Sequence, residues 1–88
     1  MISETDKTII ADLARKYGAS QILLFGSAIS KDNFNDIDLG VKGIDPKLFF
    51  RFYGDLLLAI SKPVDLIDLD MENPFIDLVR QEGVQIYG

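Results

Sequence analysis

The sequence has no cysteine, no histidine and no tryptophan among its 88 residues. Without cysteine there is no disulfide framework, no thiolate zinc site and no cysteine nucleophile. Without histidine there is no imidazole metal ligand, no Ser-His-Asp triad and no side chain that serves as the usual general base near neutral pH. Any chemistry must therefore use carboxylates, hydroxyls, lysine or arginine side chains, backbone amides and hard metal ions.

Positive charge and long apolar runs are also scarce. The chain has 9 Lys+Arg against 14 Asp+Glu, a net charge of −5, and 11 of the acids are aspartates. A surface this acidic disfavours binding to duplex DNA and to anionic lipids. The longest apolar-rich stretch, residues 48–60, is interrupted by Arg51, Gly54 and Asp55, and the amino end lacks the apolar region of a signal peptide. We expect a cytoplasmic protein that binds neither membranes nor duplex DNA directly.

Apolar periodicity predicts one domain, residues 1–88, with a hydrophobic fraction of 48% that is ample for a single core. The predicted elements are a helix over 4–17, strands over 21–25 and 36–41, a helix over 46–60, a strand over 64–69, a helix over 73–82 and an edge strand over 84–87. Helix starts are indicated by Ser3 with Asp6, by Asp45-Pro46 and by Asn73-Pro74. This order predicts a compact α+β or α/β domain.

The helix over 46–60 has apolar residues around most of its circumference. Its aromatic residues are expected to be mainly core: Phe49, Phe50, Phe52 and Tyr53. Once one face covers the sheet, the remaining apolar surface exceeds what a small monomer leaves exposed. We therefore expect a second copy or a partner chain to cover it.

Three features along the chain carry candidate chemistry. The first predicted strand runs into Gly26-Ser27, where backbone amides and the Ser27 hydroxyl suit a phosphate. Asp36 and Asp38 are i and i+2 on the next strand, so both carboxylates lie on one face about 6.6 Å apart. Asp65 lies near the start of the third strand. A few carboxylates with substrate phosphates are the ligands that Mg²⁺ prefers, and three of them suit a two-metal site.

Each feature also has an ordinary structural interpretation. With this aspartate content about one Asp-x-Asp pair arises by chance, and Asp68-Leu69-Asp70 is a second one. Such a pair is more often a solvated strand face, and Gly-Ser after a strand is commonly only a turn. Asp65 alone could cap a strand end or pair with Lys62.

The acids that follow the third strand are assigned to no site. Asp68 is offset by three from Asp65 and so faces the other side of the sheet. We expect Asp68, Asp70 and Glu72 to form a solvated capping region before the helix over 73–82.

Taken in order, these residues resemble the minimal nucleotidyltransferases of the DNA polymerase β superfamily. The resemblance rests on Leu23-Leu24-Phe25-Gly26-Ser27, on Asn35-Asp36-Ile37-Asp38-Leu39 and on Val64-Asp65-Leu66-Ile67-Asp68, and it extends to the final Gly83-Val84-Gln85-Ile86-Tyr87. It implies an α+β nucleotidyltransferase fold, a mixed sheet of about four strands with helices packed against it.

The resemblance also implies roles for particular residues. Gly26 and Ser27 would hold the β- and γ-phosphates of a nucleoside triphosphate, ATP being expected. Asp36 and Asp38 would coordinate two Mg²⁺ ions, with Asp65 as third ligand and as an aid in deprotonating the acceptor hydroxyl. The reaction would move a nucleoside monophosphate to a protein or small-molecule hydroxyl. Relatives of this size pair with a small helical HEPN-domain protein, in which case this chain would be the antitoxin of a toxin–antitoxin pair.

A binding module without turnover is the alternative function. Relatives continue after Gly-Ser with an Arg and a second Gly, whereas this chain continues Ala28-Ile29-Ser30-Lys31 and has a loop about two residues shorter. A nucleotide-binding or partner-binding module of the same fold fits that departure, the small size and the apolar helix over 46–60.

Overall fold

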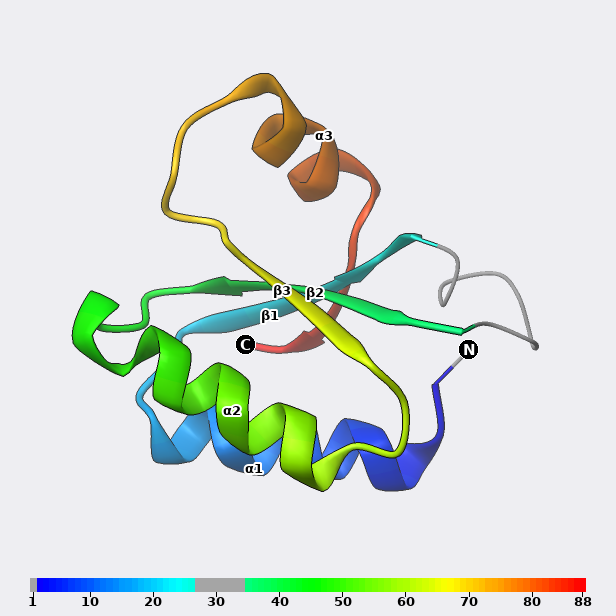
Figure 1. Ribbon diagram of the computed structural model, residues 1–88. Helices are drawn as coiled ribbons and strands as arrows, with labels where there is room; N and C mark the ends of the chain where they lie inside the picture. Colours follow the sequence, from blue (N-terminus) through cyan, green and yellow to red (C-terminus); the bar gives the residue numbers. More distant parts are fainter. Residues whose placement is uncertain (1, 27–34) are drawn as a thin grey trace.

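The computed structural model describes residues 2–26 and 35–88, which form three α-helices, a short 3-10 helix and a four-stranded mixed sheet (Figure 1). In chain order the elements are α1 (Glu4–Lys16), β1 (Gln21–Phe25), β2 (Ile37–Lys42), the 3-10 helix η2 (Pro46–Leu48), α2 (Phe49–Ala59), β3 (Val64–Asp68), α3 (Pro74–Glu82) and β4 (Val84–Tyr87). The predicted α+β class and four-stranded mixed sheet are confirmed. Ser27, and the helical turn predicted to start there, lie outside the described residues.

Local capping explains why the helices begin where the sequence predicts. Each predicted cap accepts a backbone hydrogen bond from the first turn that follows it: the pairs are Ser3 with Asp6, Asp45 with Lys47 and Asn73 with Ile76. The predicted helix over 46–60 divides in two, because its first turn winds as a 3-10 helix before α2 begins at Phe49. Its last residue is Ala59, one short of the prediction.

The strands lie in the order β3-β2-β1-β4, so β4 is an edge strand as predicted. β1 is antiparallel to both β2 and β4, while β2 and β3 are parallel. The carboxyl end of β1 therefore meets the amino ends of β2 and β3 at one end of the sheet. This topology brings together the three segments that carry the candidate residues.

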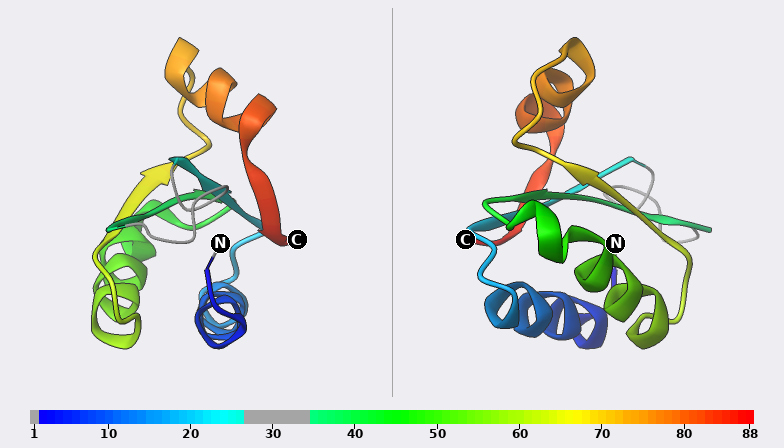
Figure 2. Two further views of the ribbon diagram at one scale, coloured as in Figure 1. Left: turned by 90° about the vertical axis from the view of Figure 1, so that its right-hand side faces the viewer. Right: turned by 60° about the vertical axis from the view of Figure 1, so that its left-hand side comes forward.

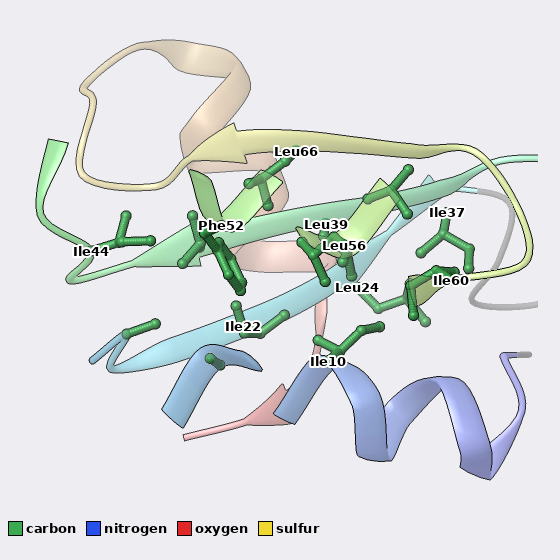
Figure 3. Close-up of a cluster of buried hydrophobic side chains, with 14 of the residues drawn as sticks. Ile10, Ile22, Leu24, Ile37, Leu39, Ile44, Phe52, Leu56, Ile60 and Leu66 are labelled. Carbon is green, nitrogen blue, oxygen red and sulfur yellow. The ribbon is translucent and has the colours of Figure 1, made fainter. Parts of the chain in front are cut away.

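The helices divide between the two faces of the sheet. α1 and α2 lie side by side on one face, and α3 lies on the other (Figures 1 and 2). The larger core fills the space between the sheet and α1 and α2 (Figure 3), and it includes Ile10, Ile22, Leu24, Ile37, Leu39, Phe52 and Leu56. On the α3 face a smaller buried cluster joins Leu23, Leu69, Ile76 and Val79.

Side-chain hydrogen bonds fix α2 between its neighbours. The Tyr17 hydroxyl donates a hydrogen bond of 2.5 Å to the Asp55 carboxylate and so connects α1 to α2. This hydrogen bond raises the pKa of Tyr17. The Tyr53 hydroxyl donates to the carbonyl oxygen of Val64 across 2.8 Å and ties α2 to β3. These two bonds hold α2 in a fixed rotation, which decides which of its apolar residues face solvent.

The aromatic residues of the predicted helix over 46–60 are not all core. Phe52 is fully buried, Phe49 and Tyr53 are partly buried, but Phe50 is 80% exposed. The prediction was wrong for Phe50 because positions two apart on a helix point about 200° away from each other, so Phe50 faces outward when Phe52 faces the sheet. In the described part of the chain, no helix is both long enough and apolar enough to cross a membrane.

Candidate functional site

Two of the predicted carboxylates lie side by side in the sheet. In the strand register Phe25 of β1 is opposite Asp38 of β2, and Asp38 is beside Asp65 of β3. Side chains of directly paired residues project from the same face of a sheet. Because Phe25 packs against the cluster under α3, the row Phe25–Asp38–Asp65 lies on the α3 face. The core under α1 and α2 occupies the opposite face.

The row places negative charges close together in a partly buried position. Asp38 is partly buried, whereas Asp36 and Asp65 are exposed. Burial raises the pKa of Asp38 above its ordinary value of 3.8, and the neighbouring charges of Asp65 and Asp36, with a hydrogen bond to Asp65, raise it further. Ionisation of the Asp38 carboxyl is therefore less favourable in the folded chain than in an isolated aspartate.

Asp36 lies close to the Asp38–Asp65 pair but does not form a three-carboxylate metal site with it. β2 begins at Ile37, so Asp36 precedes the strand instead of opening it as the predicted range 36–41 required. Asp36 acts on Asp38 through its charge. Within residues 2–26 and 35–88, no group of three or more acidic side chains is positioned to hold a metal ion. The structure thus joins Asp38 to Asp65 and leaves Asp36 as a nearby third carboxylate.

Gly26 lies directly against the Asp38 carboxylate. Its φ of +76° is in the left-handed region that favours glycine. A Cβ placed on Gly26 would lie 2.3 Å from Oδ2 of Asp38 and 3.2 Å from its Cγ. Only a residue without a side chain lets the backbone at the end of β1 approach this carboxylate. Ser27, the other predicted phosphate-binding residue, lies outside the described residues.

The donor set suits a hard divalent cation. Carboxylate oxygens are the protein ligands that Mg²⁺ takes, with its remaining positions filled by water and substrate phosphates. Burial, and then the nearby charges of Asp65 and Asp36, raise the pKa of Asp38, and a cation beside Asp38 and Asp65 would offset the repulsion between the carboxylates. The backbone of Gly26 lies close to the Asp38 carboxylate. The residues present therefore fit Mg²⁺.

Two of the acids at the end of β3 and just after it, Asp68 and Asp70, accept backbone hydrogen bonds. Asp70 accepts a hydrogen bond from the backbone N–H of Gly43 at 2.8 Å, and its own N–H donates to Asp68 at 2.9 Å. Asp70 and Glu72 are exposed as predicted, but Asp68 is partly buried. These bonds stabilise the turns at the carboxyl ends of β2 and β3. The expectation of a solvated region before α3 is correct for Asp70 and Glu72 and wrong for Asp68, and the residue that caps α3 is Asn73.

A pocket of about 430 Å³ opens at the other end of β3, away from Asp65. It is mostly apolar and is lined by Pro46, Phe49, Phe50, Leu66, Ile67, Asp68 and Met71. Asp68 is the only ionisable residue in its lining, so the pocket offers no set of groups for catalysis. The carboxylate pair and this pocket are two separate surfaces of β3.

No protein-family model and no curated protein matches the sequence. The fold, in contrast, matches solved structures. A crystal structure of a mutant MntA–HepT toxin–antitoxin pair has a TM-score of 0.77 at 25% identity, covering 93% of this chain and 72% of the other. A toxin–antitoxin structure with AMP-PNP has a TM-score of 0.75 at 27% identity, covering 93% and 73%.

A third structure contains the tri-AMPylated HEPN toxin of Shewanella oneidensis in complex with its MNT antitoxin. It has a TM-score of 0.73 at 27% identity, covering 94% of this chain and 70% of the other. In these MntA–HepT pairs, MntA is a minimal nucleotidyltransferase antitoxin partnered with a HEPN toxin. The likeness therefore covers more than nine-tenths of the chain and about seven-tenths of each neighbour.

Proposed function

We propose that this chain, which has the nucleotidyltransferase fold of these antitoxins, transfers AMP from ATP to a hydroxyl of a HEPN-type partner protein. Its fold and its resemblance to minimal nucleotidyltransferases agree with the structural likeness. The observation that carries the proposal is the pairing of Asp38 with Asp65 beside the bare backbone of Gly26. Neighbouring structures that contain AMP-PNP and an AMPylated HEPN toxin support the choice of nucleotide and acceptor.

Five residues are proposed to bind the phosphates and the metal ions. Gly26 and Ser27, which follow β1 in the sequence, would hold the β- and γ-phosphates through backbone amides and the Ser27 hydroxyl. Asp36, Asp38 and Asp65 hold two Mg²⁺ ions, which when bound neutralise the triphosphate and activate the attacking oxygen. The rigid pairing of β2 with β3 fixes Asp38 and Asp65 before substrate arrives. Prearranged charge of this kind needs little reorganisation during the reaction.

The proposed reaction is a substitution at the α-phosphorus of ATP. The acceptor oxygen forms a bond to the α-phosphorus while the bond from that phosphorus to the pyrophosphate oxygen breaks. The Asp65 carboxylate, at the exposed end of the row, takes the proton of the acceptor hydroxyl. The products are the AMP ester of the acceptor and pyrophosphate, so atoms and charge balance without an oxidant or reductant.

Titration of ATP into the purified chain tests the proposal directly. We expect calorimetric binding in Mg²⁺ that is lost in EDTA, because carboxylates and phosphates repel each other without a cation between them. α-Labelled ATP should then label a HEPN-type partner protein when one is added. Binding that is unchanged by EDTA would contradict the metal-dependent site.

A nucleotide-binding module without turnover is the second candidate. It is favoured by the absence, in residues 2–26 and 35–88, of three carboxylates already converged on one metal position. The labelling experiment separates the two functions, because the module binds Mg²⁺-ATP but leaves the partner unlabelled. Labelling of the partner would exclude it.

The exposed side of α2 is the surface proposed to contact the HEPN partner. Three apolar residues of α2 are exposed: Phe50 by 80%, Leu57 by 51% and Leu58 by 89%. Positions 50 and 57 are seven residues, or about two helical turns, apart, so Phe50 lies on the same side of the helix as Leu57 and its neighbour Leu58. Phe50 continues this surface into the apolar pocket beside Met71. A helical partner provides the apolar stripe that such a surface requires. This side of α2 and the carboxylate row belong to opposite faces of the sheet, so substitutions on α2 should leave the row itself intact.

Charge on this surface should separate partner binding from nucleotide binding. We expect Phe50→Glu combined with Leu58→Glu to abolish co-elution with the HEPN protein in gel filtration, because burying two carboxylates in an apolar interface is strongly unfavourable. Mg²⁺-ATP binding should be unchanged. Leu78→Glu is the matched control, since Leu78 is 48% exposed but lies on α3. A complex that survives the double substitution would place the interface elsewhere.

A further inference from the structure

Phe25 and Phe75 form an aromatic pair at one end of the carboxylate row. Their ring centroids are 6.0 Å apart and their planes meet at 77°, an edge-to-face contact. Phe25 is the last residue of β1 and neighbours Asp38 in the register. Phe75 is in the first turn of α3. The pair therefore extends the row to Phe75–Phe25–Asp38–Asp65 on the α3 face.

The buried cluster beneath α3 does not include Phe75. The buried cluster beneath α3 consists of Leu23, Leu69, Ile76 and Val79, and Phe25 and Ile67 pack against it. Ile76 and Val79 are each 3% exposed, so they already anchor the helix. Phe75 is 52% exposed and lies outside that cluster. A large apolar ring is thus held beside the row with half of its surface in solvent.

We propose that Phe75, supported from behind by Phe25, stacks on the nucleobase of the bound nucleotide. This inference rests on the proposed function, because that function places the phosphates at Gly26 and Asp38, next to Phe25. A nucleotide has a charged end and a flat aromatic end, and the row offers carboxylates for metal-bound phosphates at one end and an exposed ring at the other. Every nucleobase has a π-face, so this platform provides affinity for a base without reading its hydrogen-bonding edge.

Comparison of ATP with inorganic tripolyphosphate, both in Mg²⁺, isolates the contribution of the base. We expect Phe75→Ala to weaken ATP binding by roughly 5- to 150-fold, the range for loss of one base–aromatic stack. Its binding of tripolyphosphate should be unchanged, because that ligand has no base. Leu78→Ala is the matched control, since it removes a similarly exposed apolar side chain from the same helix, and it should alter neither affinity.

Phe75→Trp provides a second readout that does not depend on a loss of affinity. The chain has no tryptophan, so this variant carries a single tryptophan, at the proposed platform, whose emission can be excited selectively. We expect ATP, GTP and CTP to quench its emission and tripolyphosphate to leave it unchanged. If wild type binds ATP and tripolyphosphate equally and the tryptophan is not quenched, the platform is wrong while the metal–phosphate site stands. If neither ligand binds the wild type, the proposed function fails together with this inference.

Discussion

Replacing Asp38 with asparagine is expected to reduce AMP transfer by roughly a thousandfold or more while making the fold slightly more stable. A metal ligand supports several kcal/mol of charge stabilisation in the transition state, and about 4 kcal/mol corresponds to a thousandfold in rate. Asparagine has nearly the same shape as aspartate but carries no charge. Labelling of the partner from α-labelled ATP measures the first effect, and thermal unfolding in EDTA measures the second.

The stability effect follows from the raised pKa of Asp38. The folded chain holds this proton to a higher pH than the unfolded chain, so the protonated group favours folding at low pH. That contribution is fully present below the ordinary Asp pKa of 3.8 and is lost as pH rises through the raised pKa of the folded state. At pH 7 the wild type should therefore be less stable than Asp38→Asn. We expect less than about 1 kcal/mol, because Asp38 is only partly buried and solvent screens its charge.

Two controls separate a lost ligand from a damaged fold. Asp12→Asn removes an exposed aspartate on α1, on the far face of the sheet, where Asp12 pairs with Arg15 in the same helix. It should leave transfer unchanged. Mg²⁺-ATP should raise the melting temperature of wild type, since a ligand that binds only the folded state stabilises it, but should not raise that of Asp38→Asn. An Asp38→Asn variant that keeps full transfer would remove Asp38 from the set of metal ligands.

Local signals in the sequence were sufficient to predict the elements. The helix starts at Ser3, Asp45 and Asn73 could be predicted because a capping side chain needs only the backbone of the turn that follows it. Strands were found from short apolar runs whose neighbours are turn residues. The errors lie at the ends, as with β2, which begins at Ile37 and so excludes Asp36.

The assembled site could not be predicted from local signals, because it depends on long-range pairing. Asp38 and Asp65 meet only because β2 and β3 are parallel neighbours in register, and 26 residues of chain that include α2 lie between the two. The contact of Phe25 with Phe75 likewise depends on where α3 docks. The exposure of Phe50 was missed because composition alone does not give the rotation of α2. The resemblance of motif order supplied the candidate residues, and the topology supplied their juxtaposition.

Gly26→Ala is expected to reduce transfer by about a hundredfold, an effect much larger than its effect on stability. The new Cβ would lie 2.3 Å from Oδ2 of Asp38, far inside van der Waals contact, so the carboxylate must move. Because Asp38 has a short side chain that is only partly buried, it can rotate away at modest cost in folding free energy. Displacing a positioned group by about 1 Å costs on the order of a hundredfold in rate. The rate of partner labelling measures this loss.

Gly18→Ala is the control that separates this clash from backbone strain. Gly18 has a φ of +75°, almost equal to the +76° of Gly26, but no atom lies within 4 Å of the position of its Cβ. Both substitutions should therefore cost about 1–2 kcal/mol for forcing alanine into the left-handed region, and only Gly26→Ala should impair transfer.

A double-mutant cycle then assigns the remaining difference to Asp38. In an Asp38→Ala background the carboxylate is gone, so Gly26→Ala should cost the same folding free energy as Gly18→Ala. If Gly26→Ala costs more folding free energy than Gly18→Ala in both backgrounds, glycine is required by the backbone at the end of β1 and not by its contact with Asp38. If Gly26→Ala and Gly18→Ala cost the same folding free energy only in the Asp38→Ala background, Gly26 is needed because it leaves room for this carboxylate.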